Sequence, residues 1–332
     1  MLLRILKSNT LFSILLIPVI GILFWMHSFR SPALLEIKMA NGAMPLYYLV
    51  YNFMKGWEFW QVLIAFFLVL INSFFVAQLG SMFLFLKKRS YLPGIIYLIT
   101  VSSLQTMHSL LPVHIATLLI LLSIYFILDT YHKPVEITFT FNASFFLALA
   151  SLVYLPSLVL FPLVWIAIFV LQKSENWRLL VVPILGFGAP WLFMWAYFFL
   201  SDSSSSMWKD ITQMLWTRHN FYLLEPYFLF LTAVVVLVST LGSLSVLSVY
   251  HMMKVSSRKY FVIFYWMLGL VLASALGLIT IGIEIVAMST IPVAFFISHY
   301  LLTDGKKIWK EILTWIYVGS MVSALFFYSK SL

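Results

Sequence analysis

The stretch "EFWQVLIAFFLVLINSFFVAQLGSMFLFL", residues 58–86, decides the fold class. Its one charged residue is Glu58, at its start, and Lys87, Lys88 and Arg89 follow it directly. An apolar α-helix of about 20 residues crosses the hydrocarbon core of a bilayer. The stretch therefore predicts a membrane-spanning helix that ends in a basic cluster.

The rest of the chain has the same character. Of its 332 residues, 63% are hydrophobic and 9% are charged, and the mean hydropathy is +1.03. A soluble domain has about 25% charged residues, so this chain lacks the polar surface of a soluble fold. A transmembrane β-barrel is excluded, because its strands alternate apolar and polar residues. We expect an all-α, polytopic transmembrane bundle that forms one integral membrane domain over residues 1–332.

Apolar runs place about eleven helices along the chain. Pro112 and Pro156 divide two long runs into pairs of short helices, because proline removes a backbone donor and clashes inside a helix. The first run is expected to stay as a helix, since no small-residue cleavage site follows it. The expected spans are 10–28, 58–86, 91–109, 112–128, 138–155, 157–172, 178–200, 225–250, 260–281, 284–302 and 308–328.

The basic residues predict the orientation of these helices. With the N-terminus inside, 14 of the 20 Lys and Arg residues fall on the cytoplasmic side and six on the other. Cytoplasmic loops carry such an excess, so an odd number of helices places the C-terminus outside. The net charge of +9 is thereby explained by topology, and we expect membrane lipids and no nucleic acid as partners. The chain has no cysteine, which excludes thiolate chemistry and Cys-ligated metals.

Two segments on the outer side are longer than turns, at 28–57 and 201–224. The first contains "PLYYLVYNFM" (45–54) and the second contains "MWKDITQMLW" (207–216). Aromatic amphipathic pieces of this kind are typical of helices that lie in the membrane interface. We therefore expect interfacial helices on the outer face.

No phosphate loop, zinc-protease motif or nucleophile-elbow motif is present in the sequence. Activity would thus depend on ionisable groups near the membrane, which are costly there. Glu36 is the first candidate, because a carboxylate on the outer face can act as a general base or hold a divalent metal. The alternative is a solvated acid that pairs with Arg30 or Lys38.

Further candidates lie in and after the second outer segment. Arg218 and His219 suit a phosphate or pyrophosphate at the membrane surface, with an interfacial basic anchor as the alternative. Asp202 can position a sugar or a metal, or instead cap a helix. Glu284, at the outer start of a helix, can meet a basic group of a ligand or pair with Arg218.

His108 and His114 bracket a predicted turn between two short helices. A pair of histidines can bind zinc or relay protons, but the sequence shows no third ligand beside them. Hydrogen-bonded histidines at the interface are the favoured interpretation.

The layout resembles the membrane module of GT-C glycosyltransferases. The resemblance covers the first outer loop with Glu36, the "PLYYLVYNF" segment, and the pairs of helices "SLLPVHIATLLILLSIYFILDTYHK" and "FNASFFLALASLVYLPSLVLFPLVWIAIFVLQ". It implies a polyprenyl-phosphate-linked sugar or glycan as donor, and the catalytic acid on that first loop. The acidic pair usual in the family is absent, and Glu36 alone stands in its place.

The whole chain also resembles a family of polytopic inner-membrane proteins of Gram-negative bacteria, which implies that location and no mechanism. Three functions remain open from the sequence. The first is transfer of a glycan from a polyprenyl carrier, with a divalent metal as an optional cofactor. The second is a non-catalytic subunit that binds membrane-protein partners in an envelope-assembly or secretion complex. The third is transport of a lipid or amphiphile, which ranks last because few charges lie in the middle of the spans.

Overall fold

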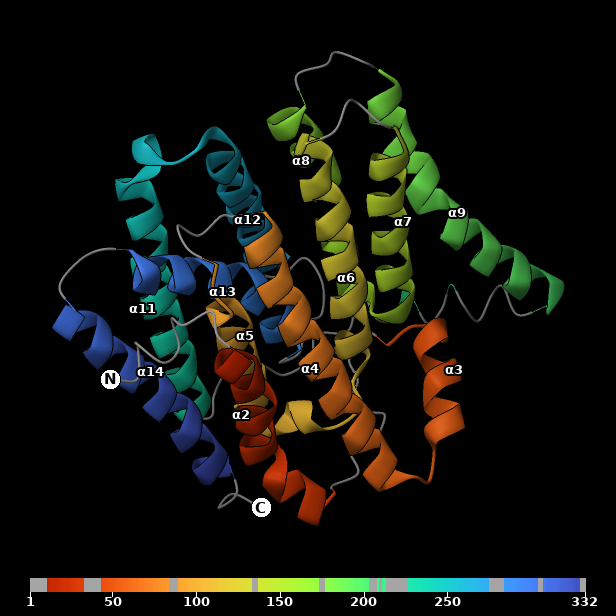
Figure 1. The fold of residues 1–332 in the computed structure, drawn as a ribbon. Helices are drawn as coiled ribbons and strands as arrows, with labels where there is room; N and C mark the ends of the chain where they lie inside the picture. Colours follow the sequence, from red (N-terminus) through yellow and green to blue (C-terminus); the bar gives the residue numbers. More distant parts are fainter. Residues whose placement is uncertain are drawn as a thin grey trace.

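The computed structural model describes residues 11–32, 43–83, 89–132, 137–172, 177–202, 208, 211–212, 226–274, 284–303 and 307–328 (Figure 1). All of its regular elements are helical in this part of the chain. The longer elements are α2 (Leu11–Arg30), α3 (Pro45–Met54), α4 (Glu58–Met82), α5 (Leu92–Ser102), α6 (Pro112–Asp129), α7 (Ile137–Val153), α8 (Pro162–Leu171), α9 (Arg178–Leu200), α11 (Pro226–Ser248), α12 (Val255–Ala273), α13 (Ile285–Leu302) and α14 (Lys307–Tyr328). Short 3₁₀ turns are η2 (Gln105–His108), η3 (Thr130–His132), η4 (Leu155–Leu160) and η6 (Tyr250–Met252).

The helices form one bundle with two flanks. In Figure 1, α4 crosses the middle of the view, with α6, α7 and α9 on one side and α11 and α14 on the other. The closest pairs are α6 with α7, α7 with α9, α11 with α13, and α4 with α5. Most buried apolar side chains belong to one continuous core, and a second, small cluster contains Met44, Leu152, Leu155 and Ile211.

Seven helices in the described part of the chain are long and apolar enough to cross a membrane. This confirms the expected all-helical class and is the pattern of a membrane protein. Each of the eleven ranges expected from the sequence contains a helix. Three of them hold shorter apolar helices, at 92–102, 137–153 and 155–171, and α14, in the range 308–328, is not among the seven long apolar spans. The seven long spans are Ser13–Arg30, Glu58–Met82, Pro112–Asp129, Arg178–Leu200, Phe230–Ser248, Val255–Ala273 and Ile285–Leu302.

Both prolines predicted to divide long runs do so. Pro112 is the first residue of α6, and Pro156 lies in the first turn of η4. Proline is well tolerated there, because the first residues of a helix have no partner for their N–H groups. The preceding helix α5 ends at Ser102, several residues earlier than the expected limit of 109. Hydroxyl groups near its end bond backward to carbonyls, as from Thr100 to Ile96 at 2.6 Å, which is typical of Ser and Thr near helix ends.

The turn between α5 and α6 is held by a set of side chains that we call the bonded cluster: Trp25, Ser28, Ser102 and His108. Ser28 Oγ lies 2.7 Å from His108 Nδ1, and His108 Nε2 lies 2.8 Å from the Ser102 carbonyl oxygen. Trp25 donates from Nε1 to Ser102 Oγ at 2.9 Å and stacks on the His108 ring at 4.3 Å. Both ring nitrogens of His108 are thereby used, as the hydrogen-bonded interpretation expected.

Helix α14 has its polar residues on the inside. Lys310 is 6% exposed, and its Nζ donates to the carbonyl and hydroxyl oxygens of Thr303 at 2.5 and 3.1 Å. The same ammonium group lies over the Tyr300 ring at 5.1 Å. Trp309 and Trp315 are more than half exposed. An apolar outer face with polar groups inside is the arrangement that a lipid environment favours.

Candidate functional site

The most deeply buried carboxylate in the described part of the chain belongs to Glu284. It directly precedes α13, is 2% exposed, and its Oε2 atom has no hydrogen-bond partner. The other described carboxylates are exposed or half-buried. Burying a charge without a partner lowers the stability of the fold. Packing alone therefore does not explain why a carboxylate stands at this position.

Tyr154 lies close enough to Glu284 for the charge of the carboxylate to act on its phenol. It lies in the turn between α7 and η4, is fully buried, and its hydroxyl group has no hydrogen-bond partner. Burial raises the pKa of the Tyr154 phenol well above its usual value, and the negative charge of Glu284 raises it further. We call Tyr154 and Glu284 the open pair, because each has a buried oxygen without a partner.

The backbone around Tyr154 joins three parts of the chain. Tyr154 N–H donates to the Ala150 carbonyl at 2.8 Å, which continues α7 by one residue. The neighbouring carbonyl of Val153 accepts from Met44 N–H at 3.1 Å, and Ala43 and Tyr154 form an isolated antiparallel bridge. Ala43 and Met44, which lie in the expected first outer segment, are therefore fixed beside Tyr154.

The open pair suits proton transfer. Burial raises the pKa of Glu284 from 4.5 to about 7, because the charged form loses its hydration. Glu284 precedes the span Ile285–Leu302, so the group lies at the end of that span. A carboxylate with a pKa near neutrality is well matched to general acid–base catalysis at physiological pH. A perturbed acid beside a second buried polar group is also a common sign of a functional site.

Three of the five site residues predicted from the sequence fall outside the described residues: Glu36, Arg218 and His219. Their roles stay predictions. Asp202 is the second residue after α9, is exposed, and has a φ of 52°. Its N–H donates to the Phe199 carbonyl at 3.2 Å. Asp202 thus ends one helix, and the structure places it in no cluster with Glu284.

The two histidines do not form a metal site in the described part of the chain, where no group of three His, Asp or Glu side chains comes together. His114 is fully buried, and its Nε2 lies 2.9 Å from the Met107 carbonyl. Its own carbonyl accepts from Asn72 Nδ2 at 3.0 Å. His114 is therefore part of the packing between α4, η2 and α6.

Tyr154 is the residue that the sequence reasoning missed. It stands in "SLVYLPSL" among apolar residues, and the one local signal is that a Pro follows two positions later and ends the helix. Its partner Glu284 is far away in the sequence, so only the fold could bring the two together. Glu284 itself was predicted, as a residue that meets a ligand.

In the comparisons with known proteins, no family model, no curated protein and no solved structure matched this chain.

Proposed function

We propose that this protein transfers a sugar or glycan from a polyprenyl-phosphate carrier at the outer face of a Gram-negative inner membrane. The observation that carries the proposal is the buried Glu284 carboxylate, with a free Oε2 atom, beside the buried Tyr154 hydroxyl. The seven long apolar helices support a membrane location, and the resemblance to GT-C enzymes supplies the reaction class.

The reaction fits the open pair as follows. A hydroxyl oxygen of the acceptor attacks the anomeric carbon of the donor sugar. The bond from that carbon to the carrier phosphate breaks, and the phosphate leaves with the electron pair. The hydroxyl proton passes to the Glu284 carboxylate, which acts as general base. The Tyr154 hydroxyl donates a hydrogen bond to the departing phosphate oxygen and stabilises the charge that develops there.

The residues predicted from the sequence complete this assignment. Arg218 and His219 hold the carrier phosphate, because guanidinium binds phosphate oxygens in bidentate fashion. Asp202, which is exposed and in no cluster with Glu284, takes no part in this assignment. Glu36 is the alternative base, since it lies in the same expected outer segment as Ala43, which forms a bridge with Tyr154. Transfer assays with and without EDTA test the contribution of a divalent metal.

The topology belongs to the same proposal: eleven spans with the N-terminus inside and the C-terminus outside. Because the chain has no cysteine, single-cysteine variants can be labelled without background. We expect Arg89→Cys and Lys306→Cys to react from the cytoplasm, and Lys38→Cys and Ser204→Cys from the outer side. Outer labelling of Arg89→Cys would refute the map.

The decisive experiment compares three Glu→Gln variants in a strain that lacks the native protein. Glu284→Gln removes the base and is expected to reduce glycan transfer at least about 100-fold. Glu36→Gln tests the alternative base. Glu58→Gln is the matched control, because Glu58 is an exposed acid in the first turn of α4.

The readouts are the envelope glycans of the cells and the amount of protein in the membrane. Normal glycans with Glu284→Gln and a loss with Glu36→Gln would move the base to Glu36. Normal glycans with both variants would favour the non-catalytic subunit, and partner proteins would then be sought by cross-linking. Accumulation of the substrate on the inner side would favour a transporter.

A further inference from the structure

The chain passes from one helix to the next at Tyr154. The Tyr154 N–H donates to the Ala150 carbonyl at 2.8 Å and continues α7, and its carbonyl accepts from Ser157 N–H at 3.1 Å and begins η4. Tyr154 itself is extended, with a φ of −141° and a ψ of 104°. Pro156 explains the break, because proline clashes inside a helix and disfavours helical backbone at the residue before it. The direction of the Tyr154 side chain therefore depends on the groups that hold one extended residue.

Ser157 holds the carbonyl group of Tyr154. Its Oγ donates to this carbonyl at 2.8 Å, in addition to the bond from its N–H. Ser157 is fully buried, so bulk water does not compete for either bond. The two bonds fix the peptide plane that follows Tyr154.

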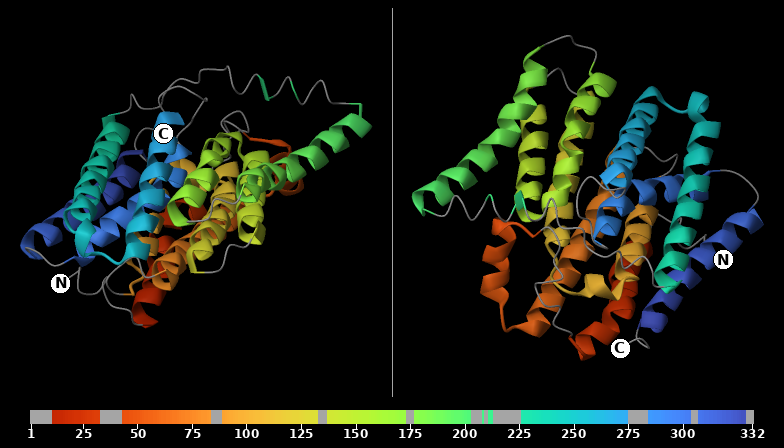
Figure 2. Two further views of the ribbon diagram at one scale, coloured as in Figure 1. Left: turned by 90° about the horizontal axis from the view of Figure 1, so that it is seen from above. Right: turned by 180° about the vertical axis from the view of Figure 1, so that it is seen from behind.

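The peptide plane that precedes Tyr154 is held by a distant part of the chain. Its carbonyl belongs to Val153, and the last carbonyls of a helix have no partner within that helix. Met44 N–H donates to this carbonyl at 3.1 Å, and Ala43 and Tyr154 form an antiparallel bridge. The described part of the chain contains no other strand-like pairing. Figures 1 and 2 show, from the front and from behind, that the start of α3 lies beside the end of α7.

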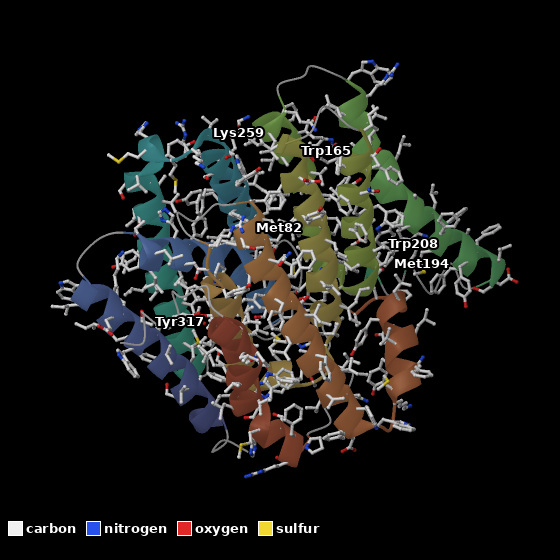
Figure 3. All side chains as sticks on the ribbon, viewed as in Figure 1. Met82, Trp165, Met194, Trp208, Lys259 and Tyr317 are labelled. Carbon is white, nitrogen blue, oxygen red and sulfur yellow. The ribbon has the colours of Figure 1, made fainter. Side chains whose placement is uncertain are left out.

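Tyr317 in α14 has the same local bond on a different backbone. Ser320 Oγ donates to the Tyr317 carbonyl at 2.8 Å, and both side chains are buried. In Figure 3, Tyr317 lies on α14, on the other side of α4 from α3. Bonds from a serine to a carbonyl are common within helices, and a regular helix orients the Tyr317 peptide plane without them. Tyr154 lies between two helices, so the bond from Ser157 takes this role.

We propose that Ser157 and the Met44 N–H group position the Tyr154 hydroxyl in the open pair. Both act through the backbone of Tyr154, so they are positioning groups and not catalytic residues. The inference deepens the proposed function, and the part of it that concerns glycan transfer rests on that function. A displacement of about 1 Å at a reacting group can slow a reaction about 100-fold. The Tyr154 hydroxyl has no hydrogen bond of its own to keep it in place, so its position depends on the backbone.

The test measures the contact within the open pair by ¹⁹F NMR, on the full-length protein in detergent with 3-fluorotyrosine at position 154. The charge of Glu284 acts on the Tyr154 phenol, so titration of the carboxyl group should shift the fluorine resonance, with a midpoint near pH 7. Glu284→Gln in the labelled protein should abolish the shift. We expect Ser157→Ala to reduce its amplitude about twofold, because the effect of a charge falls with distance. Ser157→Thr keeps the hydroxyl group and should restore the amplitude.

Two further variants separate positioning from general loss of structure. Ser320→Ala removes the equivalent bond at the Tyr317 carbonyl and should leave the shift at position 154 unchanged. Met44→Pro removes the N–H group that bonds the carbonyl before Tyr154 and should reduce the shift as Ser157→Ala does. Leu46→Pro is its control, because the N–H of the second residue of α3 has no partner within the helix. Leu46 and Met44 also pack in the same small cluster.

Two outcomes would overturn the inference. One is a full-sized shift in both Ser157→Ala and Met44→Pro, and the other is an equal reduction in the controls Ser320→Ala and Leu46→Pro. The proposed function fails separately, because the fluorine shift does not depend on glycan transfer. Transfer should fall about tenfold in Ser157→Ala and recover in Ser157→Thr. A reduced shift with normal transfer would support the positioning of Tyr154 and refute the role of the open pair in the reaction.

Discussion

The bonded cluster and the open pair are both buried and polar, and they differ in whether their polar atoms have partners. In the bonded cluster, both ring nitrogens of His108 lie within 2.8 Å of an oxygen. In the open pair, Tyr154 and Glu284 each keep a buried oxygen without a partner. A buried polar group without a partner lowers stability by about 1–3 kcal/mol. The first cluster therefore stabilises the fold, and the second is a cost that a ligand would offset.

The largest difference in stability should come from His108→Leu. This change leaves the Ser28 hydroxyl and the Ser102 carbonyl without partners and removes the stacking on Trp25. We expect a loss of about 4 kcal/mol in the free energy of unfolding, measured by thermal unfolding in detergent. His251→Leu is the control, because His251 is exposed. Similar losses of unfolding free energy in both variants would show that the hydrogen bonds of His108 do not stabilise the fold.

Glu284 should make the stability depend on pH. Its pKa is about 7 in the folded protein and 4.5 in the unfolded chain, so between these values the folded state binds more protons. The free energy of unfolding then falls as pH rises from 4.5 through 7, by on the order of 3 kcal/mol in total. Glu284→Gln should lose this dependence. A wild-type protein whose stability is flat between pH 5 and 8 would show that Glu284 is charged and paired.

Two Tyr→Phe variants sharpen the comparison, because the same hydroxyl group is removed from a bonded and an unbonded site. The Tyr47 hydroxyl donates to the Leu110 carbonyl at 2.6 Å, and this side chain is 2% exposed. We expect Tyr47→Phe to lower the free energy of unfolding by about 1 kcal/mol. The same detergent melting assay measures it.

Tyr154→Phe is the one change here that should not lower the stability. Its hydroxyl has no hydrogen-bond partner, so its removal relieves the cost of burying it and should raise the free energy of unfolding by about 1 kcal/mol. Glycan transfer should still fall at least about tenfold, because the leaving phosphate loses a hydrogen bond. A large loss of stability would mean that the hydroxyl is bonded in the membrane. Unchanged transfer would exclude it from the reaction.

The sequence predicted the positions of the helices better than their lengths. Apolar runs and the prolines at 112 and 156 placed a helix in each expected range, since both signals are local. The start of α12 was set five residues too late, at 260, because Arg258 and Lys259 suggested a polar loop. In the structure, the Lys259 ammonium group bonds the Leu171 carbonyl at 3.2 Å and faces Tyr131, and Arg258 lies over Tyr250. The contacts of Lys259 come from parts of the chain that are distant in sequence, so they leave no local pattern.

Of the two residues of the open pair, Glu284 could be predicted from the sequence and Tyr154 could not. Glu284 stood out in the sequence as an acid among apolar residues, which is a costly placement near a membrane. Its depth of burial and its proximity to Tyr154 depend on how α7, η4 and α13 pack. Glu36, Arg218 and His219 stay predictions from the sequence, because they lie outside the described residues.

The inward-facing Lys310 has a consequence for biosynthesis. The sequence predicts that α14 crosses the membrane, at 308–328. A lysine near the start of a membrane helix opposes partition from the translocon into lipid, and α14 has a second charge one turn away at Lys307 and a third at Glu311. The bonds from Lys310 to Thr303 and its position over Tyr300 join α14 to the end of α13. We expect the ribosome-bound chain to release α13 and α14 into the bilayer together, as a hairpin. A nascent chain that lacks α13 should then fail to integrate α14.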